Sequence, residues 1–137
     1  MPVTPYLFFD GRCEEALNFY RSAIGAEIAM MMRFKENPEP PQEPGCVPSD
    51  DSKIMHAAFR VGDTTIMASD GMAAGNPKFE GFALSINARD EADAARKFNA
   101  LAEGGRVQMP LARTFFAKSF GMVADRFGVG WMIIVEP

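Results

Sequence analysis

The feature that most constrains the fold is an internal repeat, in which one helix pattern recurs 78 residues further along the chain. The first pattern lies between Asp10 and Gly25, and the second lies between Asp90 and Gly104. Both place apolar residues at the spacing of one helix face, behind an acidic first turn. Few residues are identical, but size, charge and helix phase agree, which indicates a duplicated unit. The offset maps Glu15, Ala16, Leu17, Tyr20 and Ala23 onto Asp93, Ala94, Ala95, Phe98 and Leu101.

One short apolar segment precedes each helix pattern and three follow it. Runs of this length that are bounded by turn residues predict strands. In the first repeat, strands are expected at residues 5–9, 26–34, 54–61 and 64–69. In the second repeat, they are expected at residues 82–86, 107–113, 119–124 and 131–135.

Turn and cap residues support this division. Gly62-Asp63 is expected to close a hairpin, and Gly25 suits the left-handed position that ends a helix. Asp10 is the expected cap of the first helix. Asp90 is the expected cap of the second helix, and Asp93 stands three residues further on as a capping-box-like partner.

The sequence therefore predicts an α+β fold of tandem βαβββ modules. Module 1 covers about residues 4–70, residues 71–81 form a connector, and module 2 covers about residues 82–136. At 137 residues, the chain has the length of one domain, residues 1–137. A loop at residues 37–51 contains five prolines, which exclude regular structure there.

Composition excludes several classes of function. With 14 basic and 18 acidic residues, the chain carries a net charge of −4 and has no cluster of Lys and Arg. Nucleic acid and anionic membranes are therefore not expected as partners. There is no signal-peptide pattern, no apolar stretch long enough to span a bilayer and no Cys-x-x-Cys motif. These observations predict a cytoplasmic protein.

The chain contains one histidine, His56, which excludes a multi-histidine metal centre. His56 lies inside an apolar strand, where a hydrogen-bonded structural role competes with a role in binding or as a base. Cys13 stands near a helix start and would have a lowered thiol pKa if it were exposed. Asp125 is expected to shape a turn, and Asp93 is expected on a solvated helix face.

A tandem βαβββ plan of this length resembles the vicinal oxygen chelate superfamily, which includes glyoxalase I, bleomycin-resistance proteins and extradiol dioxygenases. The run from Glu14 to Tyr20 is similar to that family's first helix, and the run from Asp125 to Trp131 is similar to its terminal turn. The PhnB-like subfamily is the nearer resemblance. Three short motifs are similar to those of this subfamily: Tyr6-Leu7-Phe8-Phe9-Asp10-Gly11, His56-Ala57 and Met67-Ala68-Ser69-Asp70.

The resemblance implies a cupped mixed sheet and, in the metal-dependent members, four His, Glu or Gln ligands on the first and last strands of the modules. Alignment places these positions at Pro5, Met67, Gly81 or Phe82, and Met132. None of these residues is a ligand for a hard divalent ion. We therefore expect no metal and no cofactor.

The favoured function is binding or sequestering of a small hydrophobic or aromatic ligand, as in the bleomycin-resistance branch. His56 or Ser69 would be the polar group that orients the ligand. The Pro-rich loop between Pro38 and Pro48 would be a mobile cover. The wall of the pocket would consist of Phe8, Met67, Phe115, Trp131 and Met132.

Three alternatives stand beside binding. One is a metal-dependent lyase, isomerase or dioxygenase, which the missing ligand quartet disfavours. Another is methyl transfer, because PhnB-like sequences often carry a demethylubiquinone methyltransferase label. The chain has no GxGxxG motif after a predicted strand to support that label. The last is a module that mainly dimerises, and the family resemblance implies a homodimer in any case.

Overall fold

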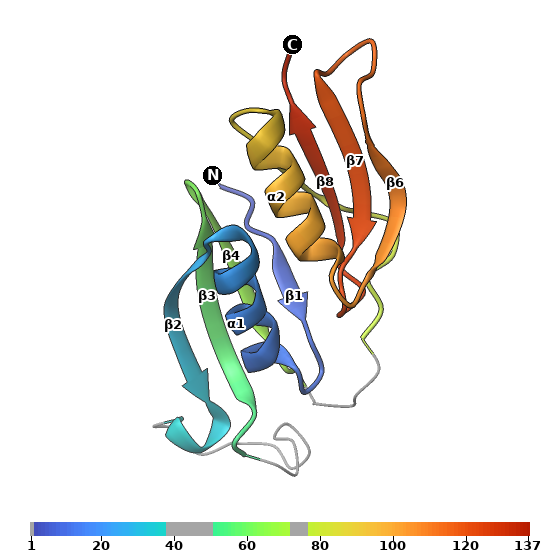
Figure 1. Ribbon diagram of the computed structural model, residues 1–137. Coiled ribbons are helices and arrows are strands. Elements are labelled where there is room, and N and C mark those ends of the chain that lie inside the picture. The colour runs from blue at the N-terminus through green and yellow to red at the C-terminus, as the bar shows by residue number, and fades with distance from the viewer. Residues whose placement is uncertain (1, 38–50, 72–76) are drawn as a thin grey trace. The chain divides into compact units, whose positions relative to one another are not determined.

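The computed structural model describes residues 2–37, 51–71 and 77–137. The chain divides into two compact units, Met1–Pro77 and Lys78–Pro137. In the described residues, each unit has one α-helix and one four-stranded mixed sheet in the order βαβββ (Figure 1). The predicted α+β plan of tandem βαβββ modules is therefore confirmed. The predicted cover between Pro38 and Pro48 lies outside the described residues.

Unit 1 has the strand order β1-β4-β3-β2, in which β1 is parallel to β4 and the other pairs are antiparallel. The β3–β4 hairpin occupies the two ranges expected from the sequence. A short 3₁₀ helix at Phe34–Glu36 follows β2. The main elements are β1 (Tyr6–Phe8), α1 (Cys13–Ile24), β2 (Glu27–Arg33), β3 (Ile54–Val61) and β4 (Thr64–Ser69).

Helix α1 covers one face of this sheet. Leu17 and Tyr20 are fully buried, and the Tyr20 ring stacks on Phe59 of β3 with 5.6 Å between ring centroids. Gly25 ends the helix with φ 71°, as expected for a left-handed C-terminal residue. The opposite face of the sheet is therefore not covered by α1.

The start of α1 differs from the expectation. Asp10 lies in the preceding turn with φ 49°, and Arg12 occupies the N-cap position without a side-chain cap. Instead, Asp70 at the end of β4 accepts a hydrogen bond from the Cys13 backbone N–H at 2.7 Å. The cap is thus supplied from 57 residues away, which a local sequence pattern does not reveal.

Unit 2 repeats the arrangement with the strand order β5-β8-β7-β6, and α2 packs on β7 and β8. Trp131 is 1% exposed, and its indole N–H donates to Asp125 Oδ2 at 2.9 Å. Asp125 Oδ1 accepts from the N–H groups of Phe127 and Val129, which confirms the predicted turn. The elements are β5 (Leu84–Asn87), α2 (Glu91–Ala102), β6 (Arg106–Ala112), β7 (Ser119–Ala124) and β8 (Gly130–Val135).

The capping pair of α2 is present, but its second member is buried. The Asp93 backbone N–H donates to Asp90 Oδ1 at 2.7 Å, as predicted. The Asp93 side chain is 1% exposed, so its expected place on a solvated face is wrong. Its carboxylate accepts from the Arg89 backbone N–H and pairs with Lys97 and Arg96. Burial opposes ionisation, but these donors and cations together lower the pKa of Asp93.

This arrangement predicts a contribution to acid stability. Because the folded-state pKa of Asp93 is lowered, its stabilisation is present above the unfolded carboxyl pKa of about 3.9 and is lost as the pH falls through the folded value. We expect the melting temperature of Asp93→Asn to fall less between pH 7 and pH 3 than that of the wild type. The matched control is Glu91→Gln on the same turn, which is exposed. An unchanged pH dependence in Asp93→Asn would contradict this.

Candidate ligand-binding face of unit 1

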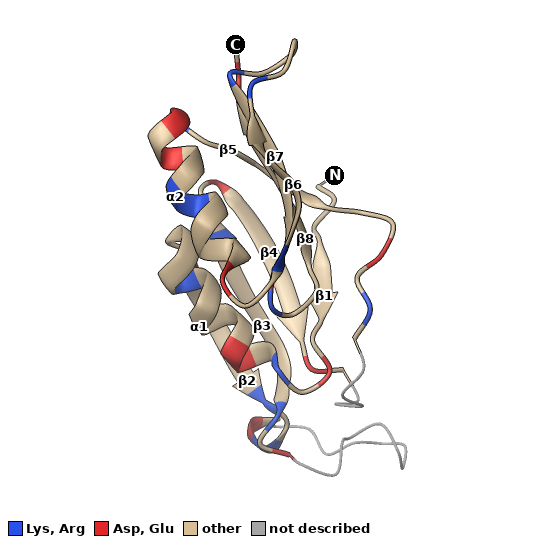
Figure 2. Cartoon of the chain, turned by 45° about the vertical axis from the view of Figure 1, so that its right-hand side comes forward, with Lys and Arg blue, Asp and Glu red and all other residues tan. Residues whose placement is uncertain are grey.

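Side chains alternate across each strand of the unit 1 sheet, so that every second residue points away from α1. In β1, Leu7 is buried, whereas Tyr6 and Phe8 are exposed. Strands β1 and β4 contain no charged residue and are drawn in tan, whereas charged residues of both signs gather on the helices and loops (Figure 2). The face away from α1 is thus apolar at this side of the sheet.

The strand register arranges this face in rows. One row runs from Tyr6 through Met67 and Ala58 to Met30. A neighbouring row contains Phe8 beside Ser69, and Met32 beside His56. We call the side chains of these two rows the open face: Tyr6, Phe8, Met30, Met32, His56, Ala58, Met67 and Ser69.

A polar row bounds the open face at one end. Arg60 stands opposite Thr65 and Glu27 in the register, and its guanidinium pairs with Glu27 at 2.5 Å. Both side chains of this ion pair are more than half exposed, so the pair stabilises the fold little. It marks the limit of the apolar area.

The open face exposes large apolar side chains. Phe8 is 54% exposed, and Tyr6 and Met30 are each 37% exposed. The Tyr6 and Phe8 rings are tilted against each other with centroids 4.8 Å apart. Contiguous exposed apolar surface of this kind marks interaction sites in soluble proteins, and the flexible thioethers of methionine adapt to different ligand shapes.

The polar groups of the open face belong to three residues. Tyr6 Oη lies 3.3 Å from His56 Nδ1, and the two rings are 5.8 Å apart. Ser69 is 2% exposed, and its hydroxyl oxygen accepts a hydrogen bond from the Gly71 backbone N–H at 3.1 Å. Ser69 therefore shapes the turn after β4, while Tyr6 and His56 place a hydrogen-bonded pair on an apolar surface.

The structure brings together four of the seven residues that the sequence suggested for the pocket. Phe8, His56, Met67 and Ser69 share the open face. The other three lie in unit 2. Met132 of β8 is half-buried, and Phe115 is fully exposed in the turn before β7. Trp131 points to the opposite face of β8 from Met132 and is buried in the core, so it lines no open wall.

Sequence reasoning missed Tyr6, Met30 and Met32 as members of the face. The signal for Tyr6 was present, because a residue two positions before Phe8 on a strand points to the same side. Met30 to Met32 are consecutive, so apolar character alone does not tell which of them face outward. Their pairing with Ala58 and His56 decides this, and pairing is a tertiary property.

The donor set does not fit the metal centre that the family resemblance implies. The two rows of the open face contain one imidazole and no carboxylate, and Met67 stands at one of the expected ligand positions. Within residues 2–37, 51–71 and 77–137, no group of three His, Cys, Asp or Glu side chains could hold an ion. A thioether is also a poor ligand for a hard divalent cation.

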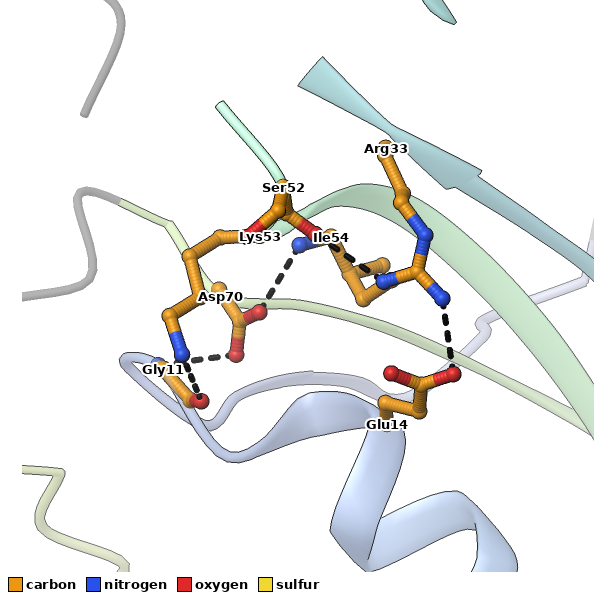
Figure 3. A pocket seen from close by; sticks show the side chains of 7 residues that line it. All are labelled: Gly11, Glu14, Arg33, Ser52, Lys53, Ile54 and Asp70. Carbon is orange, nitrogen blue, oxygen red and sulfur yellow. Dashed lines mark hydrogen bonds and ion pairs between the residues drawn. The ribbon is translucent and has the colours of Figure 1, made fainter. Parts of the chain in front are cut away.

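A separate polar cavity of about 90 Å³ lies at the start of α1 (Figure 3). Arg33 pairs with Glu14 at 2.7 Å and donates to the Ser52 carbonyl, and Lys53 donates to the Gly11 carbonyl at 3.1 Å. The hydrogen bond from Arg33 lowers the pKa of Glu14. The complete lining consists of Gly11, Glu14, Arg33, Ser52, Lys53, Ile54 and Asp70.

Asp70 and Cys13 show that this region is a structural junction. Asp70 is 1% exposed and accepts backbone N–H groups from Gly11, Cys13 and Ile54 at 2.7–2.8 Å. Cys13 is fully buried, and burial, together with Asp70 and Glu14, raises the pKa of its thiol. The expectation of a lowered thiol pKa depended on an exposed Cys13, and Cys13 is not exposed. Its thiol therefore stays protonated at neutral pH.

Solved structures define the class of fold. The chain is similar to a glyoxalase-related enzyme from Fulvimarina pelagi, with 20% identity and a TM-score of 0.65 over 100% of this chain and 88% of that chain. Together with the two mixed sheets, this likeness shows the glyoxalase/bleomycin-resistance fold. The helices of the described segments are too short or too polar to cross a membrane.

The family follows from closer relatives. A family model described as 3-demethylubiquinone-9 3-methyltransferase matches residues 1–134, so the chain belongs to this PhnB-like family. Protein YjdN of Escherichia coli is 37% identical over 98% of this chain and 95% of its own length. Protein PA1353 of Pseudomonas aeruginosa is 44% identical over 99% of this chain and 98% of that chain, with a TM-score of 0.84.

A second solved relative carries the family's description in its name. The putative 3-demethylubiquinone-9 3-methyltransferase PhnB protein from Bacillus cereus is 30% identical over 98% of this chain and 99% of that chain. Its TM-score is 0.80. These relatives establish family and fold over nearly the whole chain.

Proposed function

We propose that the protein binds a small apolar or aromatic molecule on the open face, without a metal ion. The observation that carries this proposal is the exposure of Phe8, Tyr6 and Met30 around one hydrogen-bonded pair. Covering about 100 Å² of such apolar surface contributes about 2.5 kcal/mol. This apolar burial supplies part of the binding free energy, and a polar contact orients the ligand.

Binding is favoured over catalysis by what the open face contains. Its titratable groups are Tyr6 and His56, which are joined to each other. Acid–base chemistry needs a positioned donor and acceptor around the reacting bond, and metal-assisted chemistry needs a ligand set that these rows do not offer. The function proposed here is therefore sequestration of the ligand rather than its conversion.

The family description names methyl transfer, and the fold does not favour it for this chain. In the described segments, the parallel pairs are β1–β4 and β5–β8, with one such pair in each sheet. A doubly wound parallel sheet, which would present a nucleotide-type methyl donor at its carboxyl edge, is not formed by these strands. The homodimer and the cytoplasmic location stay predictions from the sequence.

The proposal predicts that a positive charge introduced on the open face weakens binding. N-phenyl-1-naphthylamine, a neutral aromatic dye, is expected to bind saturably with increased fluorescence. Met67→Lys places an ammonium group in the middle of the apolar row and should weaken the apparent Kd about tenfold or more, because the charge must be desolvated when the dye binds. Titration with the dye measures the apparent Kd of the wild type and of Met67→Lys.

The matched control is Met109→Lys on β6 of unit 2, because Met109 is 46% exposed on a strand. It should leave the affinity for the dye unchanged. Melting curves of both variants verify that the fold is intact. Equal losses in the two variants, or no saturable binding by the wild type, would contradict a site on the open face.

A further inference from the structure

The Tyr6–His56 contact joins two strands that are not neighbours. Tyr6 is on β1 and His56 is on β3, and β4 lies between them in the sheet. The tyrosine hydroxyl reaches over this strand and lies 3.3 Å from His56 Nδ1. Such a contact fixes the imidazole relative to the apolar row that contains Met67.

The chemistry of the two groups sets the direction of this hydrogen bond. A phenol O–H is a good donor and its oxygen is a weak acceptor, whereas the unprotonated imidazole nitrogen is a good acceptor. When the imidazole is neutral, Tyr6 therefore donates and His56 Nδ1 accepts. The proton of the ring then resides on Nε2, because the partner of one nitrogen determines the tautomer.

His56 Nε2 consequently becomes a donor that requires an acceptor. His56 is half-buried, and Nε2 has no hydrogen-bond partner among the residues that the structure describes. A ligand that covers this nitrogen without accepting its proton leaves a desolvated donor unsatisfied. A ligand oxygen in that place satisfies it.

We propose that Tyr6 is a positioning residue that holds His56 as the Nε2–H tautomer, and that the open face thereby selects aromatic compounds that bear a carbonyl oxygen. This inference rests on the proposed function. The ring of the ligand covers the aromatic and thioether groups, and its carbonyl oxygen accepts from His56 Nε2–H. An otherwise equal hydrocarbon lacks the second contact.

The tautomer can be measured without a ligand. Because His56 is the sole histidine of the chain, a long-range ¹H–¹⁵N NMR spectrum assigns its two ring nitrogens without ambiguity. At about pH 8.5, we expect the Nε2–H form in the wild type. Tyr6→Phe keeps the ring but removes the donor, and it should yield a mixture of the two tautomers.

The matched control for the spectrum is Met32→Leu. Met32 stands beside His56 in the register, and its thioether side chain carries no hydrogen-bond donor. This variant should retain the wild-type tautomer. An Nδ1–H form in the wild type, or an unchanged spectrum in Tyr6→Phe, would overturn the role of Tyr6.

Selectivity is tested with two ligands of nearly equal shape, 1-acetonaphthalene and 1-ethylnaphthalene, each displacing N-phenyl-1-naphthylamine. We expect the wild type to bind the ketone about fivefold more tightly than the hydrocarbon, because the ketone gains one net hydrogen bond. Tyr6→Phe should reduce this preference and His56→Leu should abolish it, as the ratio of the two affinities within each variant measures.

The outcomes separate the two proposals. If both compounds bind the wild type equally, the carbonyl preference is wrong and the binding function stands. If neither displaces the dye, the open face is not a site for aromatic ligands and both proposals fail. If the preference survives in His56→Leu, another donor is responsible and the inference about His56 is overturned.

Discussion

Asp70→Ala is expected to destabilise the protein by about 3 to 5 kcal/mol, or to prevent folding of unit 1. The carboxylate is 1% exposed and accepts three backbone N–H groups, from Gly11, Cys13 and Ile54. Alanine removes both carboxylate oxygens and leaves the three N–H groups without their side-chain acceptor. Urea unfolding of the full chain measures the free energy of unfolding.

Two further variants complete this test. Asp70→Asn retains one acceptor oxygen but presents an amide N–H₂ group to one of the donors, so its effect should be intermediate. Asp63→Ala removes an exposed carboxylate from the β3–β4 turn and should change the free energy of unfolding by about 0.5 kcal/mol or less. Equal effects of Asp70→Ala and Asp63→Ala on the free energy of unfolding would show that the hydrogen bonds of Asp70 do not stabilise the fold.

Gly105→Ala is expected to cost about 3 kcal/mol or more, because unit 2 has no room for a methyl group at this position. A Cβ atom on Gly105 would lie 2.8 Å from the carbonyl carbon of Asp125 and closer still to the carbonyl oxygen of Ala124. Both atoms belong to the backbone at the end of β7, which cannot rotate away as a side chain would. Circular dichroism during urea unfolding measures the loss.

Gly130→Ala provides the matched control in the same unit. The nearest atom to its added Cβ would be the Phe82 carbonyl oxygen at 3.5 Å, an ordinary contact distance. The free energy of unfolding should therefore change by about 1 kcal/mol or less. If Gly105→Ala unfolds at the same urea concentration as Gly130→Ala, the backbone at Ala124 and Asp125 does not lie close enough to Gly105 to exclude a methyl group.

The tandem plan could be predicted because its signals are local. Helix periodicity, the glycine after α1 and the Gly62-Asp63 turn each act over a few residues, and the bounds of β3 and β4 agree with the prediction. The cap of α1 could not be predicted, because the acceptor is Asp70 rather than Asp10. Long-range hydrogen bonds leave no pattern in the segment that they stabilise.

The candidate site was predictable in part for a similar reason. Phe8 and Met67 lie on strands whose positions were predicted from local patterns, so both residues could be placed on the first and last strands of unit 1. Strand β8 is apolar throughout, and its sequence does not tell that Trp131 faces the core while Met132 faces away. The Tyr6–His56 pair depends on strand order, which a single sequence does not contain.

The remote cap of α1 also has a consequence for biosynthesis. The chain emerges from the ribosome with Cys13 first, and the carboxylate that accepts its N–H follows 57 residues later. Until then, the nascent helix has no side-chain cap, and isolated helices of this length are marginal in water. We expect the amino-terminal segment to remain unstructured during translation and to fold in one cooperative step when β4 becomes available.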